Sequence, residues 1–447
     1  MFDFAIERAK ELDGHFAKTG KVMGPLHGLP ISLKDSFNVP GFDSTIGYVS
    51  FIDNNKTITQ FSDFPQSLWD MGAVFHVKTN VPQTLMTTES TNHVWGTVLN
   101  PNNISLGAGG SSGGEGALAR MKGSIAGIGT DIGGSIRVPS VCNGTYGFKP
   151  SSGRLPYGGQ TNQNENDITK FGVACSAGPM ASNFEAIELI VERVLRNKPY
   201  DYDPEIKVVD YNDAFLEWDD SKKLNIGFIL EDPQIPVYPN IKRSLTEAAA
   251  LLSKAGHNVI PLTSHPSIYD GWFNANQLFY YDNCWDTWKN IVMGGEPPLT
   301  LLSHFTIPPF SWRTLKKWTR RRVELTSEWR QLFVEKKLDI ILCPGSPSSA
   351  APHNCFGRAP YLTNWNNCDF PACIIPFGKP LDSDDKFVDI DTTSPQTNIK
   401  LIPTKIPFDP IKFKGGIGHV QIVARAYEDE KLVACGKIVN QVLHPRG

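Results

Sequence analysis

The sequence predicts an α/β protein, and two observations support this fold class. Short apolar segments with the two-residue period of β-strands alternate along the chain with longer segments that have the period of an amphipathic helix. The 447 residues are 40% hydrophobic and 20% charged, a composition that provides a large apolar core. Because no linker-like stretch divides the chain, we expect one domain that spans residues 1–447.

The clearest strand–helix–strand unit lies in the second half of the chain. Residues 223–230 alternate apolar and polar side chains, and residues 257–262 return as a second strand. Between them, residues 240–256 place apolar side chains on one helical face and end at a glycine, a typical helix end. Further strands are predicted at residues 72–79, 339–345, 371–378 and 418–425.

Both ends of the chain are predicted to be helical. An amphipathic pattern begins at Phe2, and we expect the helix to end at Gly14. Residues 428–443 form a second helix with acidic residues in its first turn. The polar residues 379–398 are predicted to form a surface loop.

Charge and cysteine usage limit the classes of function. A formal net charge of −3 gives no overall basic field for nucleic acid. The N-terminal residues lack the apolar segment of a signal peptide, and no apolar run reaches the length of a membrane span. The eight cysteines form no C-x-x-C pair, which favours reduced thiols in a cytoplasmic protein. For the basic run 316–322, a solvated helix face is favoured over contact with anionic lipid.

Eleven of the 39 glycines lie between Gly107 and Gly134, which favours a binding or catalytic surface over a flexible loop. Two motifs in this segment resemble dinucleotide fingerprints, GAGGSSG and GIGTDIGG, but their spacing is loose and no clear strand precedes Gly107. The stretch GGSSG satisfies the nucleophile elbow of α/β-hydrolases, with Ser111 as nucleophile, again without the preceding strand.

A third interpretation combines serines with a lysine. The alternation of residues 29–37 places Lys34 on one strand face with Ser32 and Ser36, and Asp35 on the other. A lysine without a carboxylate partner in a dehydrated site has a lowered pKa and can act as a neutral base. The alternative is a surface lysine on an edge strand.

Three segments resemble the amidase signature family, in particular its acetamidase and fatty acid amide hydrolase branch. They are GPLHGLPISLKDSFNVPG, KTNVPQTLMTTES, and the long block from Gly109 to Pro150 that begins GGSSGGEGAL and contains GTDIGGSIRVPS. The resemblance continues through residues 176–181 and 413–433, and residues 190–340 match least. It implies the amidase signature fold, in which helices cover both faces of a central, mixed, twisted sheet.

The resemblance also implies a set of site residues. Ser135 is the nucleophile, Ser111 follows a cis peptide bond and bridges, and Lys34 is the base. The oxyanion hole maps to the segment Ile132, Gly133, Gly134 and Ser135. The substrate-binding residues are Leu85, Met86, Ser111, Ile132, Gly133 and Gly134. Glycines just ahead of the nucleophile fit this role, because side chains there would exclude the substrate.

The implied activity is hydrolysis of a carboxamide through an acyl-enzyme, to a carboxylate and ammonia or an amine. The substrate is a small aliphatic amide or one with a hydrophobic or fatty acyl group. The resemblance implies no metal or organic cofactor. The expected partner is the small-molecule amide, and a homodimer is also compatible with the sequence. One alternative is an α/β-hydrolase-type esterase that uses Ser111. Another is a truncated, non-catalytic family member with a binding or regulatory role.

Two departures from the family and one aromatic-rich segment add further expectations. The chain reads CNG, with Asn143 where the family usually has cysteine, so local packing should differ. The N-terminal helical part is shortened relative to the family. Six of the ten tryptophans lie between Trp272 and Trp329, where they either shape the acyl pocket or form buried helix faces.

Overall fold

The computed structural model describes residues 1–163, 172–219, 221–279, 284–299, 311–382, 401 and 403–445. Within them the main strands are β1 (Pro30–Lys34), β2 (Val74–Thr79), β5 (Ala126–Asp131), β6 (Tyr146–Lys149), β7 (Ser176–Ala181), β8 (Asn225–Phe228), β9 (Asn258–Pro261), β10 (Ile340–Cys343), β11 (Ala372–Pro376) and β12 (His419–Val423). A small separate hairpin is formed by β3 (Thr91–Asn92) and β4 (Gly96–Thr97).

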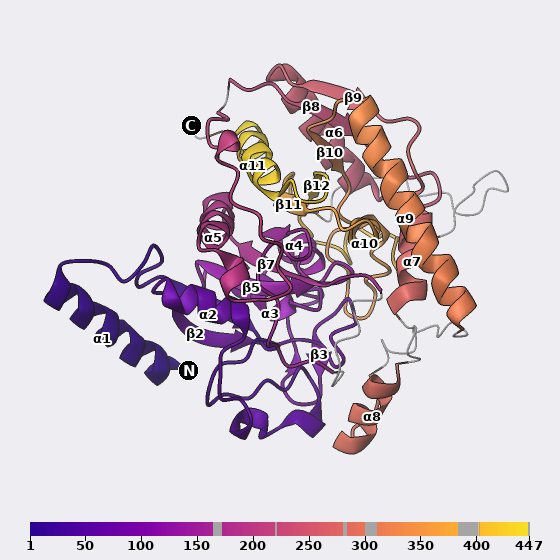
Figure 1. The fold of residues 1–447 in the computed structure, drawn as a ribbon. Coiled ribbons are helices and arrows are strands. Elements are labelled where there is room, and N and C mark those ends of the chain that lie inside the picture. The colour runs from indigo at the N-terminus through magenta and orange to yellow at the C-terminus, as the bar shows by residue number, and fades with distance from the viewer. Residues whose placement is uncertain are drawn as a thin grey trace.

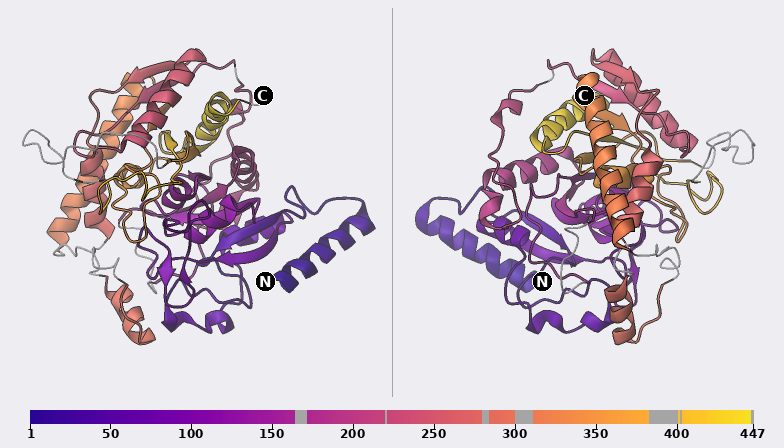
Figure 2. Two further views of the ribbon diagram at one scale, coloured as in Figure 1. Left: turned by 180° about the vertical axis from the view of Figure 1, so that it is seen from behind. Right: turned by 45° about the vertical axis from the view of Figure 1, so that its right-hand side comes forward.

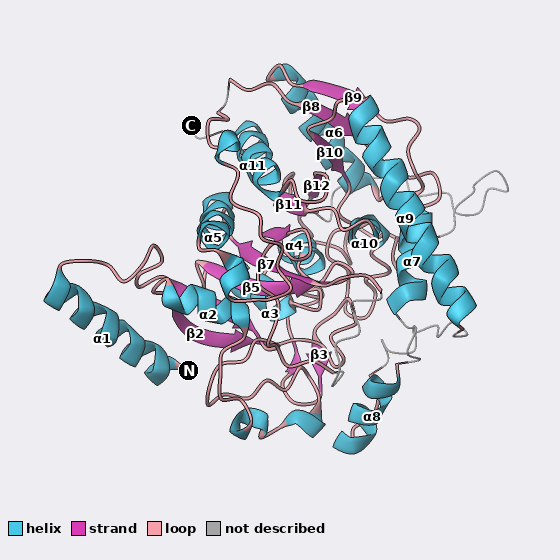
Figure 3. Cartoon of the chain, in the orientation of Figure 1, coloured by secondary structure: helices cyan, strands magenta, loops and turns pink. Residues whose placement is uncertain are grey.

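The helices are α1 (Phe2–Thr19), α2 (Asp63–Asp70), α3 (Gly113–Arg120), α4 (Arg137–Asn143), α5 (Phe184–Arg196), α6 (Pro239–Lys254), α7 (Ile268–Phe279), α8 (Trp285–Gly294), α9 (Trp312–Glu335), α10 (Pro360–Asn367) and α11 (Asp429–Leu443). They surround a ten-stranded sheet with the order β2-β1-β5-β7-β6-β11-β12-β10-β8-β9 (Figure 1, Figure 3). The strands predicted from the sequence are all present in it.

The sheet is mixed. Strand β1 pairs in parallel with β2 and β5, and β8 pairs in parallel with β9 and β10. The strands between these two parallel regions pair antiparallel, for example β5 with β7 and β11 with β12. This arrangement confirms the central mixed sheet that the family resemblance implies.

Strand β5 shows why the sequence is so rich in glycine next to the sheet. All six of its residues are buried, and a Cβ atom at Gly127 would lie 1.7 Å from Glu115 Oε2. A Cβ atom at Gly129 would lie 2.8 Å from Ser112 Oγ. The two glycines therefore allow α3 and the segment before it to approach the strand closely.

The end of α1 differs from the prediction. The helix continues through Gly14 to Thr19, and Gly20 closes it with a left-handed φ of 66° and an N–H that donates to the Phe16 carbonyl. Gly20 therefore supplies the terminating conformation, so the prediction of an end at Gly14 was wrong. Figure 2 shows α1 lying beside β2 at one end of the molecule.

The predicted surface loop at residues 379–398 falls mostly outside the described residues. The family departure at CNG lies in the well-packed part of the chain. Asn143 is fully buried, and its Nδ2 donates to the carbonyls of Ala108 at 2.7 Å and Pro139 at 2.8 Å. Asn143 thus ties the glycine-rich segment to α4.

Candidate active site

Lys34 lies at the end of β1, which is an interior strand between β2 and β5. Its side chain has no solvent exposure, so the alternative of a surface lysine on an edge strand was wrong. The Lys34 Nζ lies 2.7 Å from Ser111 Oγ and 2.6 Å from Thr130 Oγ1. The structure therefore brings two of the three predicted catalytic residues into direct contact.

Burial lowers the pKa of Lys34 to about 8, although Cys175, Asp131, Glu115 and Asp35 act in the opposite direction. Water is removed from around the amine, and the charged form loses most from this. A substantial fraction of Lys34 is consequently neutral near pH 8. Only this neutral amine has a lone pair with which to accept a proton from Ser111.

Ser111 lies in a constrained stretch of backbone. The Gly110–Ser111 peptide bond is cis, as the family resemblance implies. Ser111 is 1% exposed, and the N–H of the next residue, Ser112, donates to the Ser135 carbonyl at 3.0 Å. This contact joins the backbone segments that carry the two predicted catalytic serines.

Asp131 shapes the turn that carries Ser135. Its carboxylate accepts hydrogen bonds from the N–H of Gly134 at 2.7 Å and of Ile136 at 3.1 Å, and from Arg137 Nε at 3.0 Å. Burial on its own would raise the pKa of Asp131, but the charge and hydrogen bonds of Arg137 bring it down to about 2. The carboxylate is therefore ionised and holds the turn in one conformation.

Arg137 extends this support to other parts of the fold. Its guanidinium donates to Gln421 Oε1 on β12 at 2.9 Å and to Asn366 Oδ1 on α10 at 2.7 Å. Both Arg137 and Asp131 are fully buried. Arg137 therefore links the turn that carries Ser135 to β12 and α10.

The predicted oxyanion segment has free backbone donors. Among the described residues, the N–H groups of Ile132, Gly133 and Ser135 donate to no acceptor, whereas that of Gly134 donates to Asp131. Gly134 has a φ of 127°, which a side chain would strain. Three N–H groups next to Ser135 are thus available to bind negative charge on a substrate oxygen.

These residues line a cavity of about 90 Å³. Ser135 is half-buried in its wall, and no hydrogen bond engages its Oγ within the described part of the chain. Leu85 and Met86, which the resemblance implies as substrate-binding residues, line the same cavity. The full lining is Leu85, Met86, Thr87, Thr88, Gly110, Ile132, Gly133, Gly134, Ser135, Val138, Trp272, Asn276, Phe279, Arg358, Ala359 and Thr363.

Sequence reasoning missed several residues of this site. Thr130 contacts Lys34, and Thr363 Oγ1 donates to the Gly133 carbonyl at 2.7 Å, but neither was singled out. The aromatic-rich segment gave a usable signal, since Trp272 from α7 lines the cavity. Other tryptophans of that segment serve differently: Trp329 is fully buried, and Trp312 is 78% exposed.

Ser111 is poorly placed for the alternative role of an esterase nucleophile. It is buried against Lys34 and does not line the cavity, whereas Ser135 does. The nucleophile elbow of α/β-hydrolases needs an exposed serine between a strand and a helix. Ser111 lacks this exposure.

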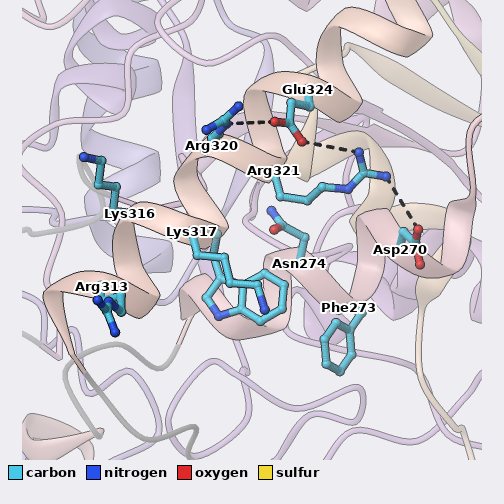
Figure 4. Close-up of a pocket in the computed structure, with 10 residues that line it drawn as sticks. Asp270, Phe273, Asn274, Arg313, Lys316, Lys317, Arg320, Arg321 and Glu324 are labelled. Atoms are coloured by element: carbon cyan, nitrogen blue, oxygen red, sulfur yellow. Dashed lines mark hydrogen bonds and ion pairs between the residues drawn. The ribbon is translucent and has the colours of Figure 1, made fainter.

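A second cavity of about 580 Å³ lies between α7 and α9 (Figure 4). We call it the basic cleft; its lining is Asp270, Phe273, Asn274, Arg313, Lys316, Lys317, Trp318, Arg320, Arg321 and Glu324. The carboxylates of Asp270 and Glu324 form ion pairs with Arg320 and Arg321. The lining of the basic cleft includes no serine or cysteine, so the smaller cavity is the better candidate for nucleophilic chemistry.

No helix in the described ranges is long and apolar enough to cross a membrane.

The chain is similar to a known family model, to several relatives and to a solved structure. Residues 1–287 match the family model described as Amidase. An amidase of Gibberella moniliformis is 36% identical, and an acetamidase of Aspergillus oryzae is 35% identical. Each alignment covers 99% of this chain, with 80% and 82% of the respective relative. The solved structure of a fatty acid amide hydrolase is similar over 99% of this chain and 78% of its own, with a TM-score of 0.90 and 29% identity.

Proposed function

Because this chain belongs to the amidase signature family of amide hydrolases, we propose that it cleaves carboxamides through an acyl-enzyme formed on Ser135. One observation carries this proposal. A fully buried lysine contacts Ser111 at 2.7 Å, directly behind a cavity that is lined by Ser135 and by unengaged backbone N–H groups. The proposal assigns the roles of nucleophile, relay, base and oxyanion donors to these neighbouring residues.

In the proposed acylation step, neutral Lys34 accepts the proton of Ser111 Oγ while Ser111 accepts the proton of Ser135 Oγ. The Ser135 oxygen forms a bond to the amide carbon, and the carbonyl π electrons move to oxygen. The N–H groups of Ile132, Gly133 and Ser135 stabilise that oxyanion. When the C–N bond breaks, Ser111 gives a proton to the leaving nitrogen and regains one from Lys34.

Deacylation reverses these roles with water as the nucleophile. The relay removes a proton from water, the hydroxide oxygen bonds to the acyl carbon, and the Ser135 oxygen leaves with the returned proton. The products are a carboxylate and ammonia or an amine. Protonation of the leaving nitrogen is the step that an amide needs most, because an amide anion is a poor leaving group.

The size of the cavity supports a small aliphatic amide as the substrate. Its volume of about 90 Å³ is well below the ~300 Å³ at which pockets for larger ligands begin. Leu85, Met86, Trp272 and Phe279 give it apolar walls that suit a short acyl chain. That the 35% identical relative from Aspergillus oryzae is an acetamidase points the same way.

The test is a panel of amides from acetamide to long-chain and aryl amides, together with labelling by a fluorophosphonate probe. We expect the highest kcat/KM for two- to four-carbon amides and a single labelled peptide that contains Ser135. A preference for long-chain amides would contradict the substrate assignment alone. A folded protein with neither labelling nor activity would contradict the catalytic function and favour a binding role.

A further inference from the structure

The buried carboxylate of Glu115 has no role in the steps proposed above, yet it lies close to Lys34. Glu115 is in the first turn of α3 and is 1% exposed. Its Oε2 accepts a hydrogen bond from Ser32 Oγ at 2.5 Å, and its Oε1 accepts one from Thr79 Oγ1 at 2.7 Å. It does not line the cavity that contains Ser135.

The strand register places Glu115 on the same side of the sheet as Lys34. Ser32 and Lys34 are two residues apart on β1, so their side chains share a face at a spacing of roughly 7 Å. Thr79 on β2 is the register partner of Lys34 itself. Both hydroxyls that hold the Glu115 carboxylate are therefore neighbours of Lys34 in the sheet.

Other charged groups around Lys34 are already paired. Asp131 forms a buried ion pair with Arg137 at 3.0 Å, and Asp35 lies 3.5 Å from Lys78 Nζ. Cys175, the remaining titratable neighbour, is a thiol. Within the described residues no lysine or arginine lies within ion-pair distance of Glu115, which contacts only hydroxyls. Among the carboxylates in the described part of the chain that act on Lys34, Glu115 is thus the one without a paired cation.

We propose that Glu115 is a positioning residue for the proposed amide hydrolysis, in which its carboxylate is the counter-charge for the ammonium that Lys34 becomes during acyl transfer. The proton that Lys34 accepts creates a positive charge on a fully buried side chain. A fixed negative charge nearby stabilises that ammonium, and two hydroxyl donors keep the carboxylate in place. Burial raises the pKa of Glu115 to about 7, against the hydrogen bonds of Ser32 and Thr79 and the charge of Lys34.

The inference predicts a specific signature for Glu115→Gln. The amide keeps the shape and can still hydrogen-bond both hydroxyls, since a hydroxyl also accepts. Without the negative charge, the Lys34 ammonium is less stable, so the acidic limb of the kcat/KM profile moves to lower pH by about one unit. Lys34 also becomes a weaker base, and kcat on the plateau falls by about tenfold. KM stays unchanged, because Glu115 does not reach the cavity.

Two further variants complete the experiment. Thr79→Val keeps the volume and removes one donor from the carboxylate, so we expect a smaller shift of the limb in the same direction. Glu430→Gln changes another buried carboxylate, which pairs with Arg154 away from Lys34, and serves as the control. It should lower the melting temperature without moving the limb.

The outcomes separate this inference from the function on which it rests. If the wild-type protein is active, and both Glu115→Gln and Thr79→Val leave its acidic limb and plateau unchanged, the proposed role of Glu115 is overturned while the proposed function stands. Losses in Glu115→Gln that follow its melting temperature, with the limb unmoved, would overturn it as well. A folded wild-type protein without amidase activity would overturn the proposed function.

Discussion

The two cavities on either side of α7 have opposite physical characters. One contains Ser135, is lined by backbone together with apolar side chains and a few polar ones, Arg358 among them, and lies next to the segment that contacts the buried Lys34. The other, the basic cleft, is more than six times larger and presents several exposed cations, among them Lys316 and Lys317. Helix α7 contributes Trp272 to the first and Phe273 to the second. Neither larger size nor more charge therefore marks the cavity that contains Ser135, the proposed reactive cavity.

What distinguishes the two sites is the hydration of their lysines. Lys34 has lost its water and gained only two hydroxyl contacts, which lowers its pKa to about 8. Lys317 stays in water and lies 4.4 Å from the ring centre of Trp318. The difference teaches that burial, not the number of cations, gives a lysine the properties of a base.

The largest effect is expected at Ser135, the proposed nucleophile. Ser135→Ala should lower kcat for amides by at least about 10³-fold, because no acyl-enzyme can form. The melting temperature should stay close to that of the wild type, since Ser135 Oγ makes no hydrogen bond within the described residues. Steady-state kinetics of the folded variant check this. Retained activity would favour Ser111 as the nucleophile. It would contradict the assignment of the chemistry to the cavity that contains Ser135.

A smaller effect is expected from narrowing the reactive cavity. A methyl group in Gly133→Ala would lie 3.2 Å from the Phe279 ring, in the wall next to Ser135. We expect kcat/KM to fall by about 10- to 100-fold with little change in stability, because the substrate carbonyl is displaced from its donors. The measurement is kcat/KM for acetamide and butyramide beside the melting temperature. If Gly133→Ala and the wild type have equal kcat/KM values, the wall formed by Gly133 and Phe279 does not contact the substrate.

The pH dependence of the wild-type protein tests the buried lysine directly. Lys34 must be neutral to act, and its pKa is about 8, so kcat/KM should rise by about tenfold from pH 7 to the plateau. Activity is therefore lost as the pH falls through this value, because protonation removes the lone pair. An initial-rate profile from pH 6 to pH 10 measures it. A flat profile would show that no group with this pKa controls the reaction.

The smallest effect is expected in the basic cleft. Lys317→Ala removes an exposed cation that does not line the reactive cavity. We expect kcat/KM to change by less than about twofold and the pH profile to stay in place. The same assays measure both. A loss of tenfold or more would show that the two cavities are coupled through α7. The view that only the cavity with Ser135 takes part in the reaction would then be wrong.

Much of the site could be predicted from the sequence because its residues lie in one continuous block and one short strand. Ser111 and Ser135 carry recognisable glycine patterns, and Lys34 lies in an alternating segment. Most strands were likewise predicted from apolar periodicity, whereas the mixed sheet was expected only from the family resemblance. These features depend on local sequence, where the patterns of strands and glycine-rich turns are strongest.

The remaining features depend on contacts between distant segments. Thr130 and Glu115 become important only because β1, β5 and α3 meet, and no local pattern separates them from other threonines and glutamates. The N–H of Gly134 is engaged by Asp131, which sequence spacing does not reveal. Helix α1 passes Gly14 because a glycine with helical dihedral angles is tolerated inside a helix.

The central claim is that Lys34 is a base that acts through Ser111, and Lys34→Ala tests it most directly when amide and ester rates are compared. An amide needs both activation of the nucleophile and protonation of the leaving nitrogen, whereas an alkoxide leaves with less help. We predict that hydrolysis of an amide falls by at least about 10³-fold, that hydrolysis of the matching ester falls at least tenfold less, and that the variant stays folded. Equal losses for both substrates together with a lowered melting temperature would contradict the account, because Lys34 would then only support the fold.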